Sequence, residues 1–441
     1  MPRDMAVDSK LSGWGRTFVP GHEIRDEQLE RVSKGAVLSR GLGRSYGDAS
    51  LPATPEDRVV GTTLADRIVG FDEATGLLTA EAGLSLSELI RIYLPRGFFP
   101  PVTPGTRFVT LGGMVASDVH GKNHHLDGSI GKYVRALKLR VADGRVLSIS
   151  RDVEPELFRA TLGGMGLTGH ILEVTLELRR VPSPWIYQES WRIAELDDFL
   201  AKLKAAGKEW PFTVGWLDTV AMKRSLLIVG RWATPEEAKG YTPTPPKTIA
   251  MPFPLPSGCM NRFTIGVFNR LVYHSHFAAH KRAVVTPYKF FHPLDRVLRW
   301  NLAYGARGVT QHQCVIPESA GPQGIRALLS VLADAGASSF LTVVKDCGEE
   351  GEGLLSFPRP GMSIALDIPI RGDTQAVVDR LNACVKDMGG RIYLTKDGFT
   401  RAEDFRAMEP RLDKFLAVRN TWDPQGQLHS AQSVRLFGDK W

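Results

Sequence analysis

The chain is poor in cysteine and has no long apolar run. Its 441 residues include only four cysteines, and no two of them form a CxxC pair. This scarcity argues against a structural zinc site and a disulfide framework, and it favours a reducing compartment. The opening residues MPRDMAVDSK lack an apolar signal core, and no run of 18 or more apolar residues occurs. We therefore expect neither a secretory signal nor a transmembrane helix. The cysteines are Cys259, Cys314, Cys347 and Cys384.

Acidic residues are missing from one long span. Between Ala238 and Leu294 there is no Asp or Glu, in a chain with a net charge of +7. The pattern suits a membrane surface with anionic head groups, or an anionic amphiphilic substrate. The alternative is an ordinary solvated basic face over a core of aromatic residues. Within the span, the proline-rich stretch 241–256 predicts an irregular loop. Basic residues here alternate with aromatic ones: Lys239, Lys247, Arg262, Arg270, Lys281, Arg282 and Lys289, with Phe253, Phe263, Phe268, Tyr273, Phe277, Tyr288, Phe290 and Phe291.

The first 180 residues have the pattern of alternating short strands and helices. Apolar residues at every second position predict strands at 137–141 and 172–178. Asp143-Gly144 predicts a hairpin turn from the first of these into Val146–Ile149. A capping box of Ser85 and Glu88 predicts a helix start, and Gly97 predicts its end.

A glycine-rich segment, Ser39–Asp48, follows the short apolar run 36–38 and reads SRGLGRSYGD. Glycines let the backbone turn tightly and approach a ligand closely. Successive amide groups in such a turn form a nest for an anion, and a diphosphate is the natural guest. The segment lacks the GK[ST] ending of a P-loop, and its last residues are a poor helix start for a dinucleotide fingerprint.

Two further glycine-rich segments follow before residue 170. Pro104–Gly131 contains two exposed turns and the run HGKNHH, and Thr161–Gly169 reads TLGGMGLTG. The clustered histidines suggest a metal, but they lack the spacing of a helical HExxH site and have no cysteine beside them. We therefore predict no metal site. Three such segments in this order are more specific than any one alone.

In combination the motifs resemble the decaprenylphosphoryl-β-D-ribose 2'-oxidase family, within the vanillyl-alcohol oxidase / p-cresol methylhydroxylase (PCMH-type) superfamily of FAD-binding proteins. The motifs are GLGRSYGD, ASDVHGKNHH, FHPLDRVLRWNLAYG, QHQCVIP, LSFPRPG and YLTKD. The resemblance covers nearly the whole chain. It implies an α+β fold with a two-part FAD-binding domain and an inserted substrate domain, an antiparallel sheet flanked by helices. The FAD-binding domain would take residues 1–184 and the return segment 391–441, and the substrate domain 185–390.

The resemblance also implies the residues that hold FAD. The first glycine-rich segment would wrap the pyrophosphate, and later segments would line the rest of the cofactor. Many superfamily members attach the flavin through a histidine in the first loop, where this chain has Tyr46. A phenol there implies a non-covalent flavin. The implied cofactor residues are Ser39, Arg40, Gly41, Leu42, Gly43, Arg44, Ser45, Tyr46, Thr106, Gly112, Ser117, Asp118, His120, Asn123, Gly166, Ile171 and Lys396.

Two residues are implied in catalysis. Lys396, in YLTKD, is the cation expected to contact substrate and flavin, because reduced flavin gains negative charge. His120 is the candidate base for the hydroxyl proton, although the sequence does not assign the base. The implied substrate-binding residues are Lys122, Trp216, Gln313, Lys345, Ser363, Ala365 and Tyr393.

The chain departs from the family in the segment MSIALD. Mycobacterial members have a pocket cysteine where this chain has Ala365, and asparagine is common where it has Ser363. Alanine cannot form the covalent adduct that nitroaromatic inhibitors make with a thiol. Resistance to such inhibitors, with turnover retained, is therefore expected. Ser363 leaves the finer substrate contacts open.

The implied reaction is FAD-dependent oxidation of the ribose 2'-hydroxyl of decaprenylphosphoryl-β-D-ribose, or a similar polyprenyl-phosphate ribose, with hydride passing to flavin N5. It is the first step of epimerisation to an arabinose donor used in arabinan synthesis. Expected partners are a membrane surface, a short-chain reductase and a quinone-type electron acceptor, at the cytoplasmic side of the inner membrane. The alternative substrate is a soluble sugar, alditol or aldonolactone. A non-enzymatic basic scaffold for nucleic acid is the third reading, and no nucleic-acid motif supports it.

Overall fold

The computed structural model describes residues 5–7, 10–256, 258–337 and 339–438. In its N-terminal part, the strands β4 (His22–Arg25), β6 (Arg58–Gly61) and β5 (Leu38–Arg40) run parallel, and β1 (Met5–Val7) pairs antiparallel with β4. The first glycine-rich loop begins where β5 ends. The short apolar run 36–38 therefore leads into the loop through the strand β5, in which Leu38 is buried.

A second N-terminal sheet is five-stranded and antiparallel, in the order β11-β10-β12-β8-β7. The predicted strands and hairpin are confirmed: β10 (Val134–Arg140) pairs with β11 (Val146–Ser150) through a turn in which Gly144 has φ 89°, and β12 (His170–Glu177) lies on the other side of β10. The remaining strands are β8 (Leu77–Glu81) and β7 (Ile68–Asp72).

The predicted helix is also present, as α2 (Leu86–Tyr93), and its first turn differs in detail. The Ser85 hydroxyl accepts from the Glu88 amide at 3.2 Å, as a cap requires. The Glu88 carboxylate, however, accepts from Arg91 Nε at 2.8 Å. Only the serine half of the predicted capping box is therefore formed. A 3-10 turn extends the helix to Arg96, and Gly97 ends it in the left-handed region. Nearby helices of this part are α3 (Leu111–Ala116), α4 (His124–Asp127) and α5 (Pro155–Thr161).

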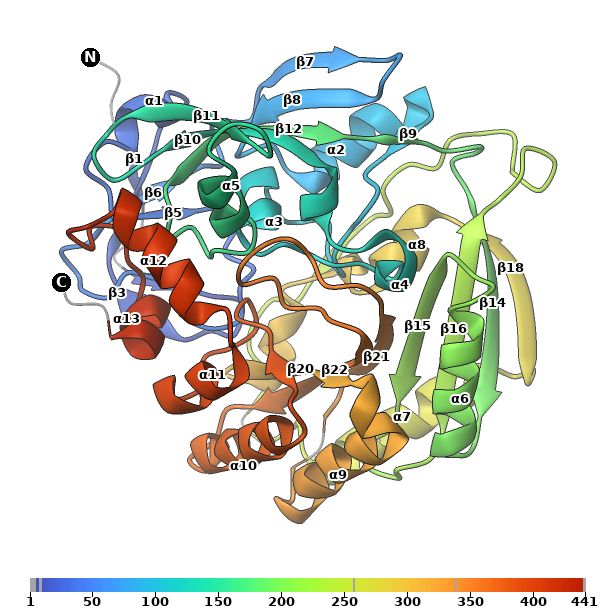
Figure 1. Ribbon diagram of the computed structural model, residues 1–441. Helices are drawn as coiled ribbons and strands as arrows, with labels where there is room; N and C mark the ends of the chain where they lie inside the picture. Colours follow the sequence, from blue (N-terminus) through green and yellow to red (C-terminus); the bar gives the residue numbers. More distant parts are fainter. Residues whose placement is uncertain (1–4, 8–9, 257, 338, 439–441) are drawn as a thin grey trace.

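An eight-stranded sheet dominates the middle of the chain, in the order β18-β14-β16-β15-β21-β22-β20-β23. Helices α6 (Leu196–Ala206), α9 (Gly321–Asp334) and α10 (Thr374–Asp387) pack on it (Figure 1). The opposite face turns towards the N-terminal sheets. The strands are β14 (Ile186–Ile193), β15 (Phe212–Leu217), β16 (Ser225–Trp232), β18 (His280–Val285), β20 (Val309–Pro317), β21 (Thr342–Cys347), β22 (Gly361–Pro369) and β23 (Arg391–Ile392).

After β23 the chain returns to the N-terminal part through α11 (Ala402–Met408), α12 (Leu412–Trp422) and α13 (Ala431–Phe437). Figure 1 shows α12 beside α5, and their Cα atoms are in contact. Arg435 on α13 donates to Asp48 and to Asp397, both at 2.8 Å. This fork ties the end of the first glycine-rich loop to the segment after β23.

The segment between β16 and β20 is mostly irregular, and the predicted loop at 241–256 contains only the short strand β17 (Ile249–Ala250). After this loop come the helices α7 (Arg262–His274) and α8 (Pro287–Phe291), and then the 3-10 helix η3 (Pro293–Arg296). The short strand β19 (Val297–Leu298) pairs with β17 and precedes a second 3-10 helix, η4 (Trp300–Tyr304). In the described part of the chain, no helix combines the length and the apolar character needed to cross a bilayer.

Candidate functional site

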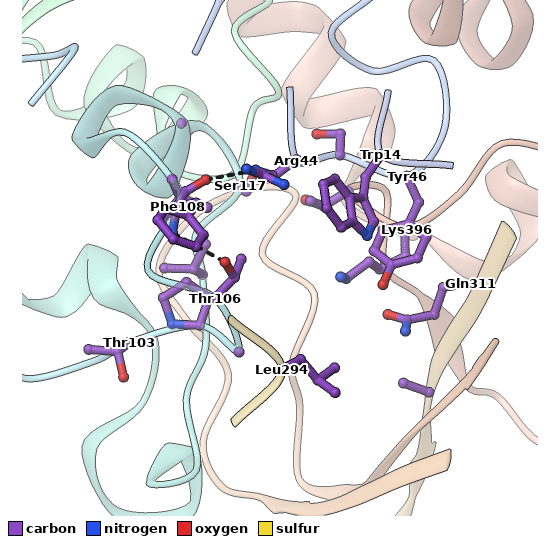
Figure 2. Close-up of a pocket in the computed structure, with 18 of the residues that line it drawn as sticks. Trp14, Arg44, Tyr46, Thr103, Thr106, Phe108, Ser117, Leu294, Gln311 and Lys396 are labelled. Carbon is purple, nitrogen blue, oxygen red and sulfur yellow. Dashed lines mark hydrogen bonds between the residues drawn. The ribbon is translucent and has the colours of Figure 1, made fainter. Parts of the chain in front are cut away.

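A cavity of about 740 Å³ lies between the N-terminal sheets and the inner face of the eight-stranded sheet. Figure 2 shows its walls: Phe108 and Thr106 lie on one side, and Tyr46, Lys396 and Gln311 on the other. Its size falls in the range of ordinary ligand pockets. Residues of all three glycine-rich segments reach it, which brings together stretches that are far apart in the sequence.

The first glycine-rich loop packs directly on the segment after β23. The Tyr46 amide donates to the Thr395 carbonyl at 2.9 Å. A Cβ built on Gly47 would overlap the Asp397 carbonyl oxygen, and one built on Gly41 would overlap the Thr110 hydroxyl. Only glycine permits both approaches. The loop is therefore a narrow cradle with its backbone against the cavity.

Arg44 supplies charge to this cradle. Its Nε donates to the Phe108 carbonyl at 3.1 Å, and its guanidinium lies 4.2 Å from the centre of the Trp14 ring. Arg40 does the opposite and turns away from the cavity. It donates to the buried Glu23 at 3.1 Å, to Ser50 and to the Ser12 carbonyl.

Most of the sequence-predicted cofactor residues line the cavity, and three do not. Besides Arg40, these are Asp118 and Asn123. Asp118 has φ 36° and accepts from the Gly131 amide at 2.8 Å and from Ser356. Asn123 donates to the Pro101 carbonyl at 2.8 Å. Those that line it are Ser39, Gly41, Leu42, Gly43, Arg44, Ser45, Tyr46, Thr106, Gly112, Ser117, His120, Gly166, Ile171 and Lys396.

All the predicted substrate-binding residues line the same cavity, most of them from one face of the eight-stranded sheet. Register explains the grouping: Gln313 lies opposite Ala365, and Lys345 opposite Ser363. Trp216 belongs to β15 on the far side of β21. The full set is Lys122, Trp216, Gln313, Lys345, Ser363, Ala365 and Tyr393.

Sequence reasoning missed two residues of this face, Gln311 and Asp367. They lie opposite each other in register, and the Gln311 amide donates to the Asp367 carboxylate. Each stands two positions from a predicted residue, Gln313 and Ala365. Side chains two apart on a strand point the same way, so the strand period was a signal that could have found them.

Lys396 and Asp367 form the electrostatic centre of the site. Lys396 Nζ lies 4.1 Å from the centre of the Tyr46 ring. Burial lowers the pKa of Lys396 to about 8, with Asp367 opposing that change and Lys345 adding to it. Burial raises the pKa of Asp367 to about 6, against hydrogen bonds from Gln311 and from the Tyr304 hydroxyl at 2.8 Å. Lys396 is therefore a cation near neutral pH that loses its charge in mild alkali.

His120 is held as a neutral imidazole. The Gln313 amide nitrogen donates to His120 Nε2 at 3.0 Å, and the same nitrogen donates to the Ser363 hydroxyl at 3.1 Å. Burial lowers the pKa of His120 well below its usual value, and Lys345 lowers it further. Its buried Nδ1 has no hydrogen-bond partner among the described residues.

Basic groups outnumber acidic ones beside His120. Lys122 donates to the Phe290 carbonyl, and burial lowers the pKa of Lys122 to about 7, with Lys345 contributing. Burial also lowers the pKa of Lys345. A cavity with this surplus of lysines is suited to an anionic ligand. The negative charge of such a ligand would raise the lowered pKa of each lysine and so favour its charged form.

One arm of the cavity is apolar. It runs along β15 and β16 towards the segment formed by η3, β19 and α7. The side chains that line it are Val214, Leu226, Ile228, Val272, Leu294, Val297, Leu298, Leu341 and Val343.

Cysteine chemistry and metal chemistry find little support at the site. The four cysteines form no disulfide, and burial raises the pKa of Cys347 to about 12 and that of Cys314 further. Both thiols are therefore held protonated. Within the described residues no group of His, Cys, Asp and Glu side chains is arranged to hold a metal ion.

Comparison with known proteins adds a family model and several relatives. An FAD-binding domain model matches residues 30–150. The chain is 33% identical to decaprenylphosphoryl-β-D-ribose oxidase of Mycolicibacterium smegmatis, over 97% of each protein. It is 32% identical to an uncharacterised protein of Streptomyces coelicolor, over 80% of this chain and all of that one. A putative D-arabinono-1,4-lactone oxidase of Neurospora crassa is 28% identical over only 37% of this chain and 31% of its own length.

The residues present fit FAD. The matched stretch 30–150 contains the first glycine-rich loop and the turns at 104–131. A side chain at Gly41 or Gly47 would occupy the space through which the loop approaches its neighbours. Arg44 offers a half-buried cation to a diphosphate. Lys396 and His120 line the same cavity beyond the cradle. A cofactor with an anionic stem and a redox-active ring is what such a cavity accommodates.

Proposed function

Because the chain belongs to the decaprenylphosphoryl-β-D-ribose oxidase family of FAD-linked oxidoreductases, we propose that it oxidises the 2'-hydroxyl of decaprenylphosphoryl-β-D-ribose, or of a similar polyprenyl-phosphate ribose, to the 2'-keto sugar. One observation carries this proposal. A single cavity joins a glycine cradle, the cation of Lys396, a surplus of lysines and an apolar arm. These four parts match in turn a dinucleotide, a reacting alcohol, a phosphate and a prenyl chain.

The reaction removes a hydride from C2' and a proton from its hydroxyl. Bound FAD supplies the hydride acceptor, at flavin N5. Lys396 places its ammonium group in the cavity and stabilises negative charge that develops there. It also orients the substrate hydroxyl, since the ammonium has donors to spare beyond its contact with Tyr46.

His120 is our candidate for the proton acceptor. Its imidazole is neutral, which is the form a base requires. A half-turn of the Gln313 amide would let the amide oxygen accept from His120 Nε2 and leave Nδ1 as the open acceptor. An anionic substrate beside Lys345 offsets that lysine's charge and raises the pKa of His120, so substrate binding itself strengthens the base.

The flavin is held without a covalent bond in this proposal. Tyr46 occupies the cradle where a histidine tether would stand, and burial raises the pKa of its phenol well above the usual value. A neutral phenol is a poor nucleophile, and its ring is already covered by Lys396. Acid precipitation of the purified protein should therefore release all of its yellow colour into solution.

The proposal includes partners and a division into domains. We propose a quinone-type electron acceptor, a short-chain reductase that completes epimerisation for arabinan synthesis, and a peripheral position at the cytoplasmic side of the inner membrane. We keep 1–184 with 391–441 as the FAD-binding domain and 185–390 as the substrate domain. The strand β23 (Arg391–Ile392) still pairs with β20 of the large sheet, and residues 1–4, 8–9 and 439–441 lie outside the described part.

The direct test is turnover by the purified FAD-loaded protein, with decaprenylphosphoryl ribose in detergent and a quinone-like dye. A 2'-keto product is expected, whereas free alditols and aldonolactones should give no turnover. The lactone oxidase match is confined to 37% of this chain, so it supports the cofactor and not the substrate. Efficient turnover of a soluble sugar instead would replace the proposed substrate and leave the FAD assignment intact.

A further inference from the structure

Large apolar side chains are exposed mainly in one region of the molecule. Within residues 241–277 the exposed fraction is 92% for Phe277, 78% for Phe263, 73% for Ile249, 65% for Leu271 and 63% for Phe253. These are the highest exposed fractions among the large apolar residues of the described chain. Large apolar side chains that are exposed together in one segment indicate an interaction site in a folded protein.

The helix α7 presents apolar residues on opposite sides. Ile265 and Asn269 are buried, and Asn269 donates to the buried Asp218 at 2.9 Å, which anchors this side to the protein. Phe263, Val267 and Leu271 follow one another at a spacing of four residues on the other side and are all exposed. Large apolar side chains on the exposed side of a helix normally contact a partner or a membrane. The outer side of α7 is therefore expected to contact another molecule or a membrane.

The charge around this surface indicates what covers it. No Asp or Glu occurs from Ala238 to Leu294, while Arg262, Arg270 and Lys281 are exposed there. Arg282 contributes less, because it is paired with Glu189 at 3.2 Å. Exposed aromatic and aliphatic residues interspersed with basic ones, in a segment without acidic residues, are the composition of a surface that enters an anionic bilayer. A protein partner would instead need a mixed polar rim.

The same elements also form the end of the apolar arm of the cavity. Val272 of α7, Ala250 of β17 and Val297 of β19 line the cavity, whereas Phe263 of α7 and Ile249 of β17 face solvent. Val297 itself is 39% exposed, so apolar surface continues from the arm to the outside. In Figure 1, α7 lies on the side of the molecule away from β7 and β8.

We propose that the outer side of α7, with Ile249, Phe253 and Phe277, inserts into the headgroup region of an anionic bilayer, and that a prenyl chain passes from the bilayer beneath α7 into the apolar arm. We call this set of residues the α7 surface. The prenyl path rests on the proposed function, whereas bilayer binding does not. The chain of a lipid-linked sugar would then never cross water, and its phosphate would reach the lysines of the cavity from the membrane side.

The test is co-sedimentation of the FAD-loaded protein with vesicles of phosphatidylglycerol and phosphatidylcholine. The variant combines Phe263→Ser, Leu271→Ser and Phe277→Ser, all of them highly exposed, so the fold should survive. We expect vesicle binding to fall at least tenfold. A second variant, Arg262→Glu with Arg270→Glu, should lower binding to phosphatidylglycerol vesicles and leave the weak binding to pure phosphatidylcholine unchanged.

A matched control removes exposed apolar residues elsewhere: Phe18→Ser, Val69→Ser and Val153→Ser, at 51%, 59% and 53% exposed. It should bind vesicles as the unaltered protein does. Unchanged binding by the α7 variant, or no binding by the unaltered protein, would overturn the proposal. A dimer in solution that the α7 variant dissociates, without vesicle binding, would assign the surface to a second copy instead.

Activity separates this proposal from the proposed function. With substrate dissolved in detergent, the α7 variant should keep its turnover rate. With substrate embedded in vesicles, its turnover should fall in parallel with binding. Another outcome is that the unaltered protein binds vesicles and the α7 variant does not, while neither oxidises prenylphosphoryl ribose under either condition. That result would refute the proposed substrate and support the bilayer-binding proposal.

Discussion

At the scale of single residues, the role that we propose for Lys396 depends on its charge. Its pKa is lowered by burial to about 8, so the ammonium is present below that pH and lost above it. We expect kcat/KM to fall as the pH rises through about 8. Lys396→Met should lower kcat by about 10²–10³-fold, the usual cost of removing one positioned electrostatic group, and should abolish this alkaline limb.

Lys396→Arg is the matched control, because a guanidinium keeps its charge throughout the range. Its activity should be reduced by the changed geometry, yet flat with pH where the unaltered protein declines. The comparison is a set of pH profiles of flavin reduction. An alkaline limb that persists in Lys396→Met would assign the titration to another group.

Ala365 makes a separate prediction about inhibitors. It lines the cavity opposite Gln313, and the nearest thiol in sequence, Cys347, has its pKa raised to about 12 by burial. Mass spectrometry after turnover with a nitroaromatic inhibitor should find no adduct on the unaltered protein. Ala365→Cys should gain one, because it places a thiol in the cavity. A stable adduct on the unaltered protein would contradict this account.

Some residues could not have been placed from the sequence. Arg40 stands in a glycine-rich loop, where a phosphate contact was the natural expectation, yet it pairs with Glu23. Glu23 belongs to another strand, β4, so no local sequence pattern around Arg40 predicts the pairing. Likewise the hydrogen bond from the Tyr304 hydroxyl to Asp367 joins η4 to β22. Only the tertiary fold creates such pairs.

At the scale of elements, the close approach between the first glycine-rich loop and the segment after β23 is the contact that shapes the cradle. Gly47→Ala would push a methyl group into the Asp397 carbonyl. We expect a loss of at least about 1–3 kcal/mol in the free energy of unfolding and weaker FAD binding, because overpacking must separate the two segments.

Gly372→Ala is the matched control, since a Cβ there meets no atom within 4 Å. Its melting temperature and flavin content should equal those of the unaltered protein. Thermal unfolding with and without added FAD measures both effects. If Gly47→Ala retained full flavin content and stability, the cradle would not depend on this contact.

Elements with strong local patterns were predicted correctly, and those that depend on distant partners were not. The hairpin of β10 and β11 follows from alternation and Asp143-Gly144 alone. The capping of α2 was only half right, because Glu88 had a competing partner in Arg91. The sequence indicated that the span 238–294 suits a membrane surface, but it did not show which side of α7 is exposed, because that depends on how the helix packs on the rest of the fold.

At the scale of the whole molecule, the cavity depends on the chain's return after β23. Lys396 enters the site from this return, and Arg435 of α13 holds Asp48 and Asp397 together behind it. The N-terminal segments supply the cradle, and the eight-stranded sheet supplies the substrate face. In the proposed function, cofactor and substrate therefore meet only when segments from both ends and the middle of the chain are assembled.

The measurement that tests the central claim most directly is anaerobic single-turnover reduction of the bound flavin, followed by its yellow absorbance. The account predicts complete bleaching by decaprenylphosphoryl ribose, with one 2'-keto sugar formed per flavin, and none by free alditols or aldonolactones. A flavin that stays oxidised with the prenylphosphoryl ribose and is bleached by a soluble sugar would contradict it.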